Sequence, residues 1–330
     1  MKHQPSPINV AKDYDAKRHA VNRALSKLFR AKPDELYEPA RYILEGKGKR
    51  FRPMLVLFGA ESISGSSKNA MPLALAVEVL HNFTLIHDDI MDKADLRHGR
   101  PTVHKKWDID TAILTGDVMH ATAFELVLQT KSKNLQRILS LFAESVIRIC
   151  DGQAYDKAFE LRKDVSLDDY LMMISYKTGR LISASLELGG LAADASPEQA
   201  KRLRQIGELI GRAFQIQDDL LDIMAGEKSG KRLGGDLIEG KKTFLLLKAL
   251  ELTKGKDHAL LKSIIKNKGI DPSRVMEVKA IYERCGVIEE TQATIKRDFE
   301  KAKSHALKLP HQRGREQLIA FAELVMNREF

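Results

Sequence analysis

Apolar residues recur at the spacing of an α-helix along most of this chain, and this pattern constrains the fold more than any other feature. Few stretches alternate apolar and polar residues as a half-buried β-strand would. The clearest helical stripes comprise Leu73, Val77, Leu80 and Thr84; Leu135, Ile138, Leu139, Phe142 and Val146; and Leu203, Ile206, Leu209, Ile210, Ala213 and Ile216. Because the linkers between such segments are short, the sequence predicts an all-α fold, a single large helical bundle.

The 330 residues are expected to form one domain, residues 1–330, with residues 1–20 as a basic N-terminal arm. A chain of this length could also hold two domains of average size. Residues 1–17 are polar and charged, and no run of 18 apolar residues occurs, so neither a signal peptide nor a transmembrane helix is predicted. The two cysteines, Cys150 and Cys285, are too few for a disulfide framework or a zinc site. We therefore expect a cytoplasmic protein.

Two copies of the pattern Asp-Asp-x-x-Asp each follow a helix-like apolar segment. In a helix, the first and last Asp of each copy lie four residues apart on one face. Carboxylates crowded in this way repel each other unless a cation lies between them, and hard oxygen ligands suit Mg²⁺. We expect the two copies to face each other across the bundle and to bind Mg²⁺, rather than to form two solvated acidic surfaces. The predicted metal ligands are Asp88, Asp89, Asp92, Asp218, Asp219 and Asp222.

The charge of the chain predicts an anionic partner. The formal net charge is +9 and the isoelectric point is near 9.3, values that suit nucleic acid, anionic lipid or phosphorylated metabolites. Aromatic residues make up only 6% of the chain, which is few for a protein that stacks bases, and the basic residues lie in short clusters beside glycines. Small phosphorylated substrates are therefore favoured over nucleic acid or a membrane surface.

Several polar groups are placed to receive such substrates. Residues 48–53 combine a glycine with three cations and a proline, and residues 95–100 supply further cations close to the first Asp pattern. Each cluster could instead be an exposed basic turn. A polar stripe on the first Asp helix marks a cavity; it comprises His81, Thr84, Asp88 and Asp92. Residues 176–179 place a Lys and a Thr within a helix where Gly179 predicts a bend.

Taken together, these residues resemble the trans-type isoprenyl diphosphate synthases, which are head-to-tail prenyltransferases. The resemblance spans about residues 46–243. It rests on Gly-Lys-Arg-Phe-Arg-Pro at 48–53, His81, both Asp patterns, Asp-Leu-Arg-His-Gly-Arg-Pro-Thr-Val-His at 95–104, Gly-Asp at 116–117, Lys-Thr-Gly at 177–179, Phe-Gln-Ile-Gln at 214–217, Gly-Asp at 235–236 and Gly-Lys-Lys-Thr at 240–243.

The resemblance implies a homodimer with a central catalytic cavity, in which isopentenyl diphosphate condenses with an allylic prenyl diphosphate. It implies about three Mg²⁺ ions. For the allylic diphosphate site it implies Arg97, Lys177, Thr178, Gln215 and Lys231, of which Lys177, Thr178 and Gln215 would also have catalytic roles. For the isopentenyl diphosphate site it implies Lys49, Arg52, His81 and His98.

The chain departs from the family pattern at His98, where the family usually has a second arginine. A neutral imidazole is a weaker phosphate ligand than a guanidinium, so isopentenyl diphosphate binding is expected to be looser or pH-dependent.

In the expected reaction, cations stabilise the leaving diphosphate, the double bond of isopentenyl diphosphate attacks the allylic cation, and the departed diphosphate accepts the proton. His87 and His104 are interpreted as packing or capping residues, because no protein base is needed.

Product length is expected to depend on Phe83 and Thr84. An aromatic residue five places before the first Asp, with a small residue four places before it, resembles the synthases that stop at the C20 product, geranylgeranyl diphosphate. An ideal helix alone would not select Phe83, which lies about 140° from Asp88 around the axis. A farnesyl diphosphate synthase and a synthase of C25 and longer products are alternatives that the sequence also allows.

Three other classes are less consistent with the sequence. A class I terpene cyclase would not need the basic cluster at 48–53, and its second metal motif usually mixes Asn, Ser or Thr with Glu. A basic helical nucleic-acid-binding protein would leave both Asp patterns without a role. A non-catalytic partner subunit would usually have lost Asp residues that are all present here.

Overall fold

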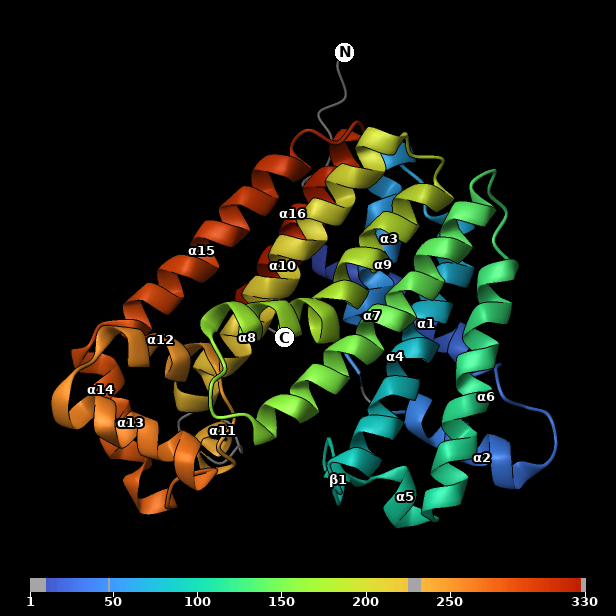
Figure 1. The fold of residues 1–330 in the computed structure, drawn as a ribbon. Helices are drawn as coiled ribbons and strands as arrows, with labels where there is room; N and C mark the ends of the chain where they lie inside the picture. The colour runs from blue at the N-terminus through green and yellow to red at the C-terminus, as the bar shows by residue number, and fades with distance from the viewer. Residues whose placement is uncertain (1–9, 47, 225–232, 328–330) are drawn as a thin grey trace. The chain divides into compact units, whose positions relative to one another are not determined.

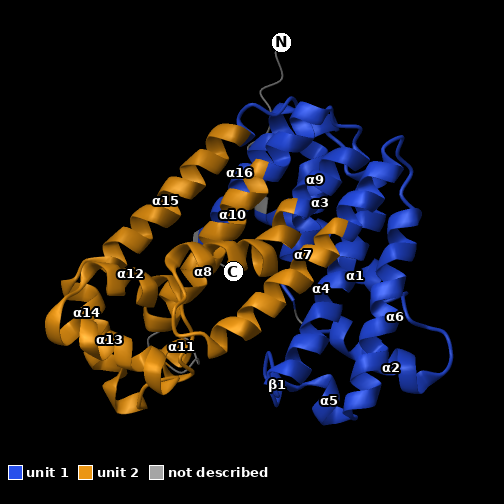
Figure 2. Ribbon diagram, in the orientation of Figure 1, with its two compact units in different colours: residues 1–143, 184–204, 306–330 blue, residues 144–183, 205–305 orange. Residues whose placement is uncertain are grey.

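The computed structural model describes residues 10–46, 48–224 and 233–327. Within these ranges the regular elements are helices except for one two-stranded hairpin, so the all-α prediction is confirmed (Figure 1). The chain divides into two compact units, described here separately (Figure 2). Unit 1 comprises residues 1–143, 184–204 and 306–330, and unit 2 comprises residues 144–183 and 205–305. The expected single domain stays a prediction.

Unit 1 contains most of the N-terminal half of the chain. Its complete elements are α1 (Val10–Leu25), α2 (Asp34–Leu44), α3 (Phe51–Ser64), η1 (Lys68–Ala70), α4 (Met71–Met91), β1 (Leu96–Arg97), β2 (Arg100–Pro101), α5 (Val103–Lys106), α6 (Ile109–Leu128) and α16 (Gln312–Asn327). The unit boundary falls within α7 (Leu135–Leu161), α9 (Arg180–Ala192) and α10 (Pro197–Met224).

The core of unit 1 is built on α3 and α4, whose residues are buried on most sides. A helix that is apolar all round is stable only when other helices cover it. Phe321 of α16 fills the space beside α3, with its ring centroid 5.0 Å from that of Phe58 and 5.8 Å from that of Phe51. By length and composition alone, residues 68–91 and 109–128 could cross a membrane, but 61% of the apolar window of the first segment is buried, as expected for a core helix.

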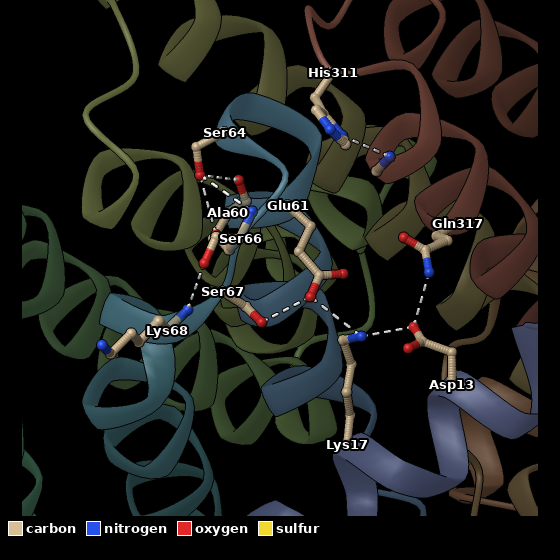
Figure 3. Close-up of polar contacts among 11 residues, drawn as sticks. Asp13, Lys17, Ala60, Glu61, Ser64, Ser66, Ser67, Lys68, His311 and Gln317 are labelled. Carbon is tan, nitrogen blue, oxygen red and sulfur yellow. Dashed lines mark hydrogen bonds and ion pairs between the residues drawn. The ribbon is translucent and has the colours of Figure 1, made fainter.

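Residues 10–20 of the expected N-terminal arm lie instead in α1, which packs on unit 1. The Tyr14 ring stacks on Phe321 at 5.6 Å. A polar network also ties α1 to α3 and α16 (Figure 3): Lys17 Nζ lies 2.6 Å from Asp13 and 3.1 Å from Glu61. Gln317 donates to the same Asp13 carboxylate at 3.0 Å. Residues 10–20 are therefore part of a packed helix, because the apolar face of α1 finds a partner in α16, and residues 1–9 of the expected arm lie outside the described residues.

Unit 2 contains the remaining helices. Its complete elements are α8 (Leu167–Ile174), the π-helical turn η2 (Ser175–Gly179), α11 (Gly235–Ile238), α12 (Phe244–Leu252), α13 (Gly255–Asn267), η4 (Pro272–Arg274) and α14 (Val275–Arg284), and it holds all of α15 (Val287–Ala306) except its last residue. One buried cluster, which includes Tyr170, Ile174, Ile216 and Phe244, fixes α8 against α10 and α12. This packing sets the positions of the polar residues at the end of α10 and in η2.

Candidate active site

The first Asp pattern lies at the C-terminal end of α4, and its three carboxylates differ in environment. Asp89 is 1% exposed, and both Nε and Nη2 of Arg97 contact its Oδ1, at 2.8 and 2.7 Å. Asp88 is half-buried, and Asp92, the C-cap of the helix, is exposed. Asp89 is therefore anchored inside unit 1, whereas Asp88 and Asp92 are accessible to a metal ion.

The β1–β2 hairpin that carries Arg97 has His98 and Gly99 at its turn. Both have positive φ, 51° and 74°. A two-residue hairpin with positive φ at both central positions matches the twist of its strands. The turn places the exposed His98 side chain on unit 1, which also contains His81.

The basic cluster before α3 separates into structural and accessible cations. Arg50 is buried with Glu78, at 2.7 Å from Nη1 to Oε1. Arg52, one residue into the helix, donates from Nη1 to Nε2 of His81 at 3.1 Å. Burial first, and then the Arg52 charge, hold the pKa of His81 well below its usual range, so the ring is a neutral acceptor. Tyr14 O–H fixes the backbone beside this pair by donating to the carbonyl of Lys49 at 2.7 Å.

The two predicted product-length residues have different surroundings. The Phe83 ring lies 4.8 Å from the ring of His87 and 5.2 Å from that of His120 on α6. Thr84 donates its hydroxyl to the carbonyl of His81 in its own helix, at 2.8 Å. Phe83 therefore faces α6, and its role in product length stays a prediction. His87 packs against α6 so closely that a Cβ at Gly116 would lie 2.1 Å from its Nε2.

Sequence reasoning missed the residues that extend the aromatic contacts of Phe83 across α6 to α7. The ring of His120 lies 5.2 Å from that of Phe124, which in turn lies 5.1 Å from Phe142 on α7. We call Phe83, His120, Phe124 and Phe142 the aromatic column. The four-residue spacing of the two α6 members was a usable signal, but nothing in the sequence linked them to α4.

The second Asp pattern lies near the end of α10, where its middle residue is again anchored. Asp219 is buried and accepts hydrogen bonds from Tyr170 O–H at 2.5 Å, the Phe244 N–H at 2.9 Å and Gln215 Nε2 at 3.2 Å. Burial outweighs these hydrogen bonds and raises the pKa of Asp219 to about 7. Asp218 is half-buried, so the arrangement parallels that of Asp88 and Asp89.

The last Asp of the second pattern is held by α11. Asp222 accepts the backbone N–H of Asp236 at 3.1 Å, and burial raises the pKa of both carboxyls. Asp236 also lies 3.4 Å from Lys241. The predicted substrate ligand Lys231 lies outside the described residues.

The three predicted catalytic residues lie in unit 2 around η2. Thr178 O–H donates to Gln215 Oε1 at 3.1 Å, and Gln215 in turn contacts Asp219, so these side chains form one hydrogen-bonded chain. Lys177 Nζ lies 2.5 Å from Asp156 on α7, a partner that sequence reasoning missed. α7 packs so tightly on this turn that a Cβ added at Gly152 would lie 2.3 Å from the backbone nitrogen of Lys177. The predicted bend at Gly179 is a π-helical turn.

The carboxylates suit Mg²⁺ by chemistry. Asp88 and Asp92 lie in unit 1 and Asp218 and Asp222 in unit 2, so their expected meeting across the bundle stays a prediction. Across the parts of the chain that the structure describes, no three acidic, His or Cys side chains form a complete metal cage. A donor set of a few carboxylates is typical of Mg²⁺, which takes its other ligands from water and substrate phosphates.

Comparisons with known proteins are consistent with this site. Residues 33–284 match the family model described as polyprenyl synthetase. The chain is 38% identical to a short chain isoprenyl diphosphate synthase of Methanothermobacter thermautotrophicus over 90% of this chain and 91% of that protein. It is 35% identical to a geranylgeranyl pyrophosphate synthase of Geoglobus acetivorans, over 94% and 96%. A crystal structure of geranylgeranyl pyrophosphate synthetase from Pyrococcus horikoshii superposes with a TM-score of 0.90 at 35% identity, covering 97% of this chain and 98% of that one.

Proposed function

We propose, from the premise that this chain belongs to the polyprenyl synthetase family, that it condenses isopentenyl diphosphate with an allylic prenyl diphosphate and makes geranylgeranyl diphosphate. The observation that carries the proposal is the shared design of the two Asp patterns. In each, the middle carboxylate is anchored, Asp89 by Arg97 and Asp219 by Tyr170, and a more accessible carboxylate precedes it. A solvated acidic surface would have no need of two such anchors.

The allylic diphosphate would be held by cations and metal ligands. Asp88, Asp92 and Asp218 would hold Mg²⁺, which when bound neutralises charge on the leaving diphosphate. Lys177 would exchange its contact with Asp156 for a diphosphate oxygen, since a single carboxylate is a weaker partner than a multiply charged phosphate. Because Thr178 donates its proton to Gln215, the lone pairs of the Thr178 oxygen are left to face an allylic cation.

Isopentenyl diphosphate would bind at the N-terminal end of α3. Arg52, which donates to neutral His81, would contact a diphosphate oxygen, and Lys49 and His98 would add cationic contacts. The isopentenyl site is thus assigned to residues of unit 1, and the Lys177 contacts belong to unit 2. The departing diphosphate would accept the proton released on condensation, and no protein base is assigned.

Product length would be set by the aromatic column. A chain growing beside α4 would meet the Phe83 ring, which His120 supports from α6. This contact favours the C20 product over C25 and longer ones. A farnesyl diphosphate synthase would need a side chain that blocks the growing chain closer to the Asp patterns.

We also propose a homodimer located in the cytoplasm. The helix α6 leaves several large apolar side chains exposed, namely Ile109, Ile113, Leu114 and Leu128. Apolar side chains gathered on one helix mark a protein interaction surface, and a second copy of the chain would cover them. Light scattering should give about twice the 37.1 kDa mass of one chain.

The test is incubation with labelled isopentenyl diphosphate and each of three allylic starters, dimethylallyl, geranyl and farnesyl diphosphate, with products separated by chromatography. Asp88→Ala and Asp218→Ala should each lower kcat by at least ~100-fold, because a lost metal ligand acts mainly on the transition state. Asp168→Ala, which removes an exposed carboxylate from α8, is the matched control. Near-native turnover of both variants at saturating Mg²⁺ would refute the assignment. Diphosphate release without isopentenyl diphosphate would indicate a cyclase.

A further inference from the structure

A cavity of about 600 Å³ lies within unit 2 and is not formed by the residues assigned above. Its walls come from α7, α8, η2, α9, α10 and α15. The basic and aromatic side chains that line the cavity are Arg148, Tyr176, Arg180, Arg212, Lys301 and His305. A concave site with several converging polar groups is a candidate for a small ligand.

Two of the cations are held in place from behind. Arg212 makes a two-pronged contact with the buried Asp298, at 2.6 Å from Nε and 2.7 Å from Nη2. This geometry leaves the Nη1 hydrogens of Arg212 for another partner. Arg180 donates from Nε to Ser145 at 3.2 Å, and its Nη2 is buried and makes no hydrogen bond to any described residue, although Glu144 lies 3.2 Å away. Both guanidiniums are thus ordered before any ligand arrives.

The other cations are more adaptable. Arg148 lies over the Tyr176 ring at 5.3 Å and forms an ion pair with the exposed Asp151 of its own helix, at 3.2 Å. Lys301 and His305 project from neighbouring turns of α15. The Nδ1 atom of His305 is buried without a hydrogen-bond partner among the described residues. An unpaired buried ring nitrogen costs free energy, which a ligand oxygen would offset.

The cations of the lining favour an anion, while Asp298 and Asp151, which lie outside the lining, pair with Arg212 and Arg148. Four Arg and Lys side chains line the cavity against two carboxylates, Glu144 and Glu208, and His305 can add a donor. The volume exceeds what phosphate alone would fill, and the Leu171 and Leu209 side chains and the Tyr176 ring provide an apolar wall. We propose that this cavity binds an organic phosphate, with its phosphate groups on Arg148, Arg180, Arg212 and Lys301 and its organic body on the apolar wall.

This site shares η2 with the proposed catalytic residues. Tyr176 lines the cavity, whereas Lys177 and Thr178, the next two residues, make the contacts described for the allylic site. A π-helical turn is a rare and adaptable conformation, so a ligand held by Tyr176 and Arg180 would bias the position of Lys177. The regulatory part of the proposal rests on the proposed function, but ligand binding itself does not.

The test uses the full chain and titration calorimetry in the presence of EDTA, which suppresses metal-dependent binding elsewhere. The probes are ADP, geranylgeranyl diphosphate and inorganic diphosphate, so that a nucleotide, a prenyl diphosphate and a bare anion are distinguished. Arg148→Ala and Lys301→Ala should each weaken the preferred organic phosphate by at least ~10-fold, as expected for loss of one charge-assisted contact. Lys262→Ala, an exposed lysine of α13, is the matched control.

The outcomes separate the two proposals. Equal affinity of every probe for wild type, Arg148→Ala and Lys301→Ala would overturn the cavity as a binding site. Binding of inorganic diphosphate alone would overturn the organic-phosphate assignment. Selective loss in both variants supports the site even if the chain condenses no prenyl diphosphate. If condensation occurs, the preferred phosphate should change kcat of the wild type and not that of Lys301→Ala, whose activity without the ligand should be unchanged.

Discussion

Replacement of Arg50 by Ala tests whether the basic cluster before α3 is divided between stability and substrate binding. The Arg50 and Glu78 side chains are only 6% and 5% exposed, and their ion pair spans 2.7 Å. Arg50 also donates to Asn22 at 2.8 Å and to the carbonyls of Leu44 and Gly46 at 2.5 and 3.1 Å. Arg50 has a φ of 51°, and Ala at this position would have to adopt the same conformation. Backbone strain therefore contributes equally to wild type and Arg50→Ala.

The expected loss follows from what Arg50→Ala leaves behind. Among the described residues, Glu78 would keep the contact from Asn82, at 3.4 Å, and would be a buried charge without its ion-pair partner. Breaking such a pair costs about 3–5 kcal/mol, against a total unfolding free energy of roughly 5–15 kcal/mol. Adding Glu78→Gln removes the orphaned charge and should restore part of the loss. Equilibrium unfolding in urea, followed by circular dichroism, measures each variant.

Two comparisons make the Arg50 experiment decisive. Lys105→Ala breaks an exposed ion pair of similar length, with side chains 47% and 77% exposed, and should cost no more than about 1 kcal/mol. Arg52→Ala should leave the unfolding free energy within about 1 kcal/mol of wild type while it raises KM for isopentenyl diphosphate. A loss for Arg50→Ala no larger than that for Lys105→Ala would refute the reasoning.

Three further predictions concern single side chains. Phe83→Ala removes the ring that contacts His120 and should shift the product from C20 to C25 or longer by chromatography; a variant that still stops at C20 would place the floor elsewhere. His98→Arg should lower KM for isopentenyl diphosphate by ~10-fold, the value of one added charge-assisted contact, and an unchanged KM would make His98 a bystander. Because the pKa of Asp219 is raised from 3.8 to about 7, the folded form keeps a proton that the unfolded form releases, so the unfolding free energy should fall as pH rises from about 4 to 7, by at most ~4 kcal/mol. In EDTA, Asp219→Asn should flatten this dependence, and an equally steep profile in the variant would contradict it.

The sequence predicted the helices and the Asp patterns because both depend on local spacing. Apolar periodicity requires only that each stripe be buried, and four-residue spacing places two Asp side chains on one helix face whatever lies opposite. The pairing of Arg52 with His81 could be inferred only through the family resemblance, since the two residues lie in different helices. In the structure, Nη1 of Arg52 lies 3.1 Å from Nε2 of His81.

The sequence could not predict which members of a cluster would be anchored. Nothing in residues 48–53 separates Arg50 from Arg52; the difference arises because Glu78, on another helix, is buried opposite Arg50 alone. Likewise, Lys177 meets Asp156 through the packing of α7 on η2, a contact between segments separated by 21 residues. Gly179 indicated a bend, but the conformation of that bend depends on how closely the neighbouring helices approach.

The π-helical turn also fixes the length of the chain between α8 and α9. A π turn accommodates one residue more than the α-helix it interrupts, so α8 and α9 are offset from each other by about 100° of helix rotation. Deleting one residue of Ser175–Gly179 would make the helix regular and at the same time rotate one of these helices against its packing partners. The Lys177 amine would then leave Asp156. Homologous chains that preserve this chemistry should therefore tolerate substitution of Ser175 more readily than a change in the length of the turn.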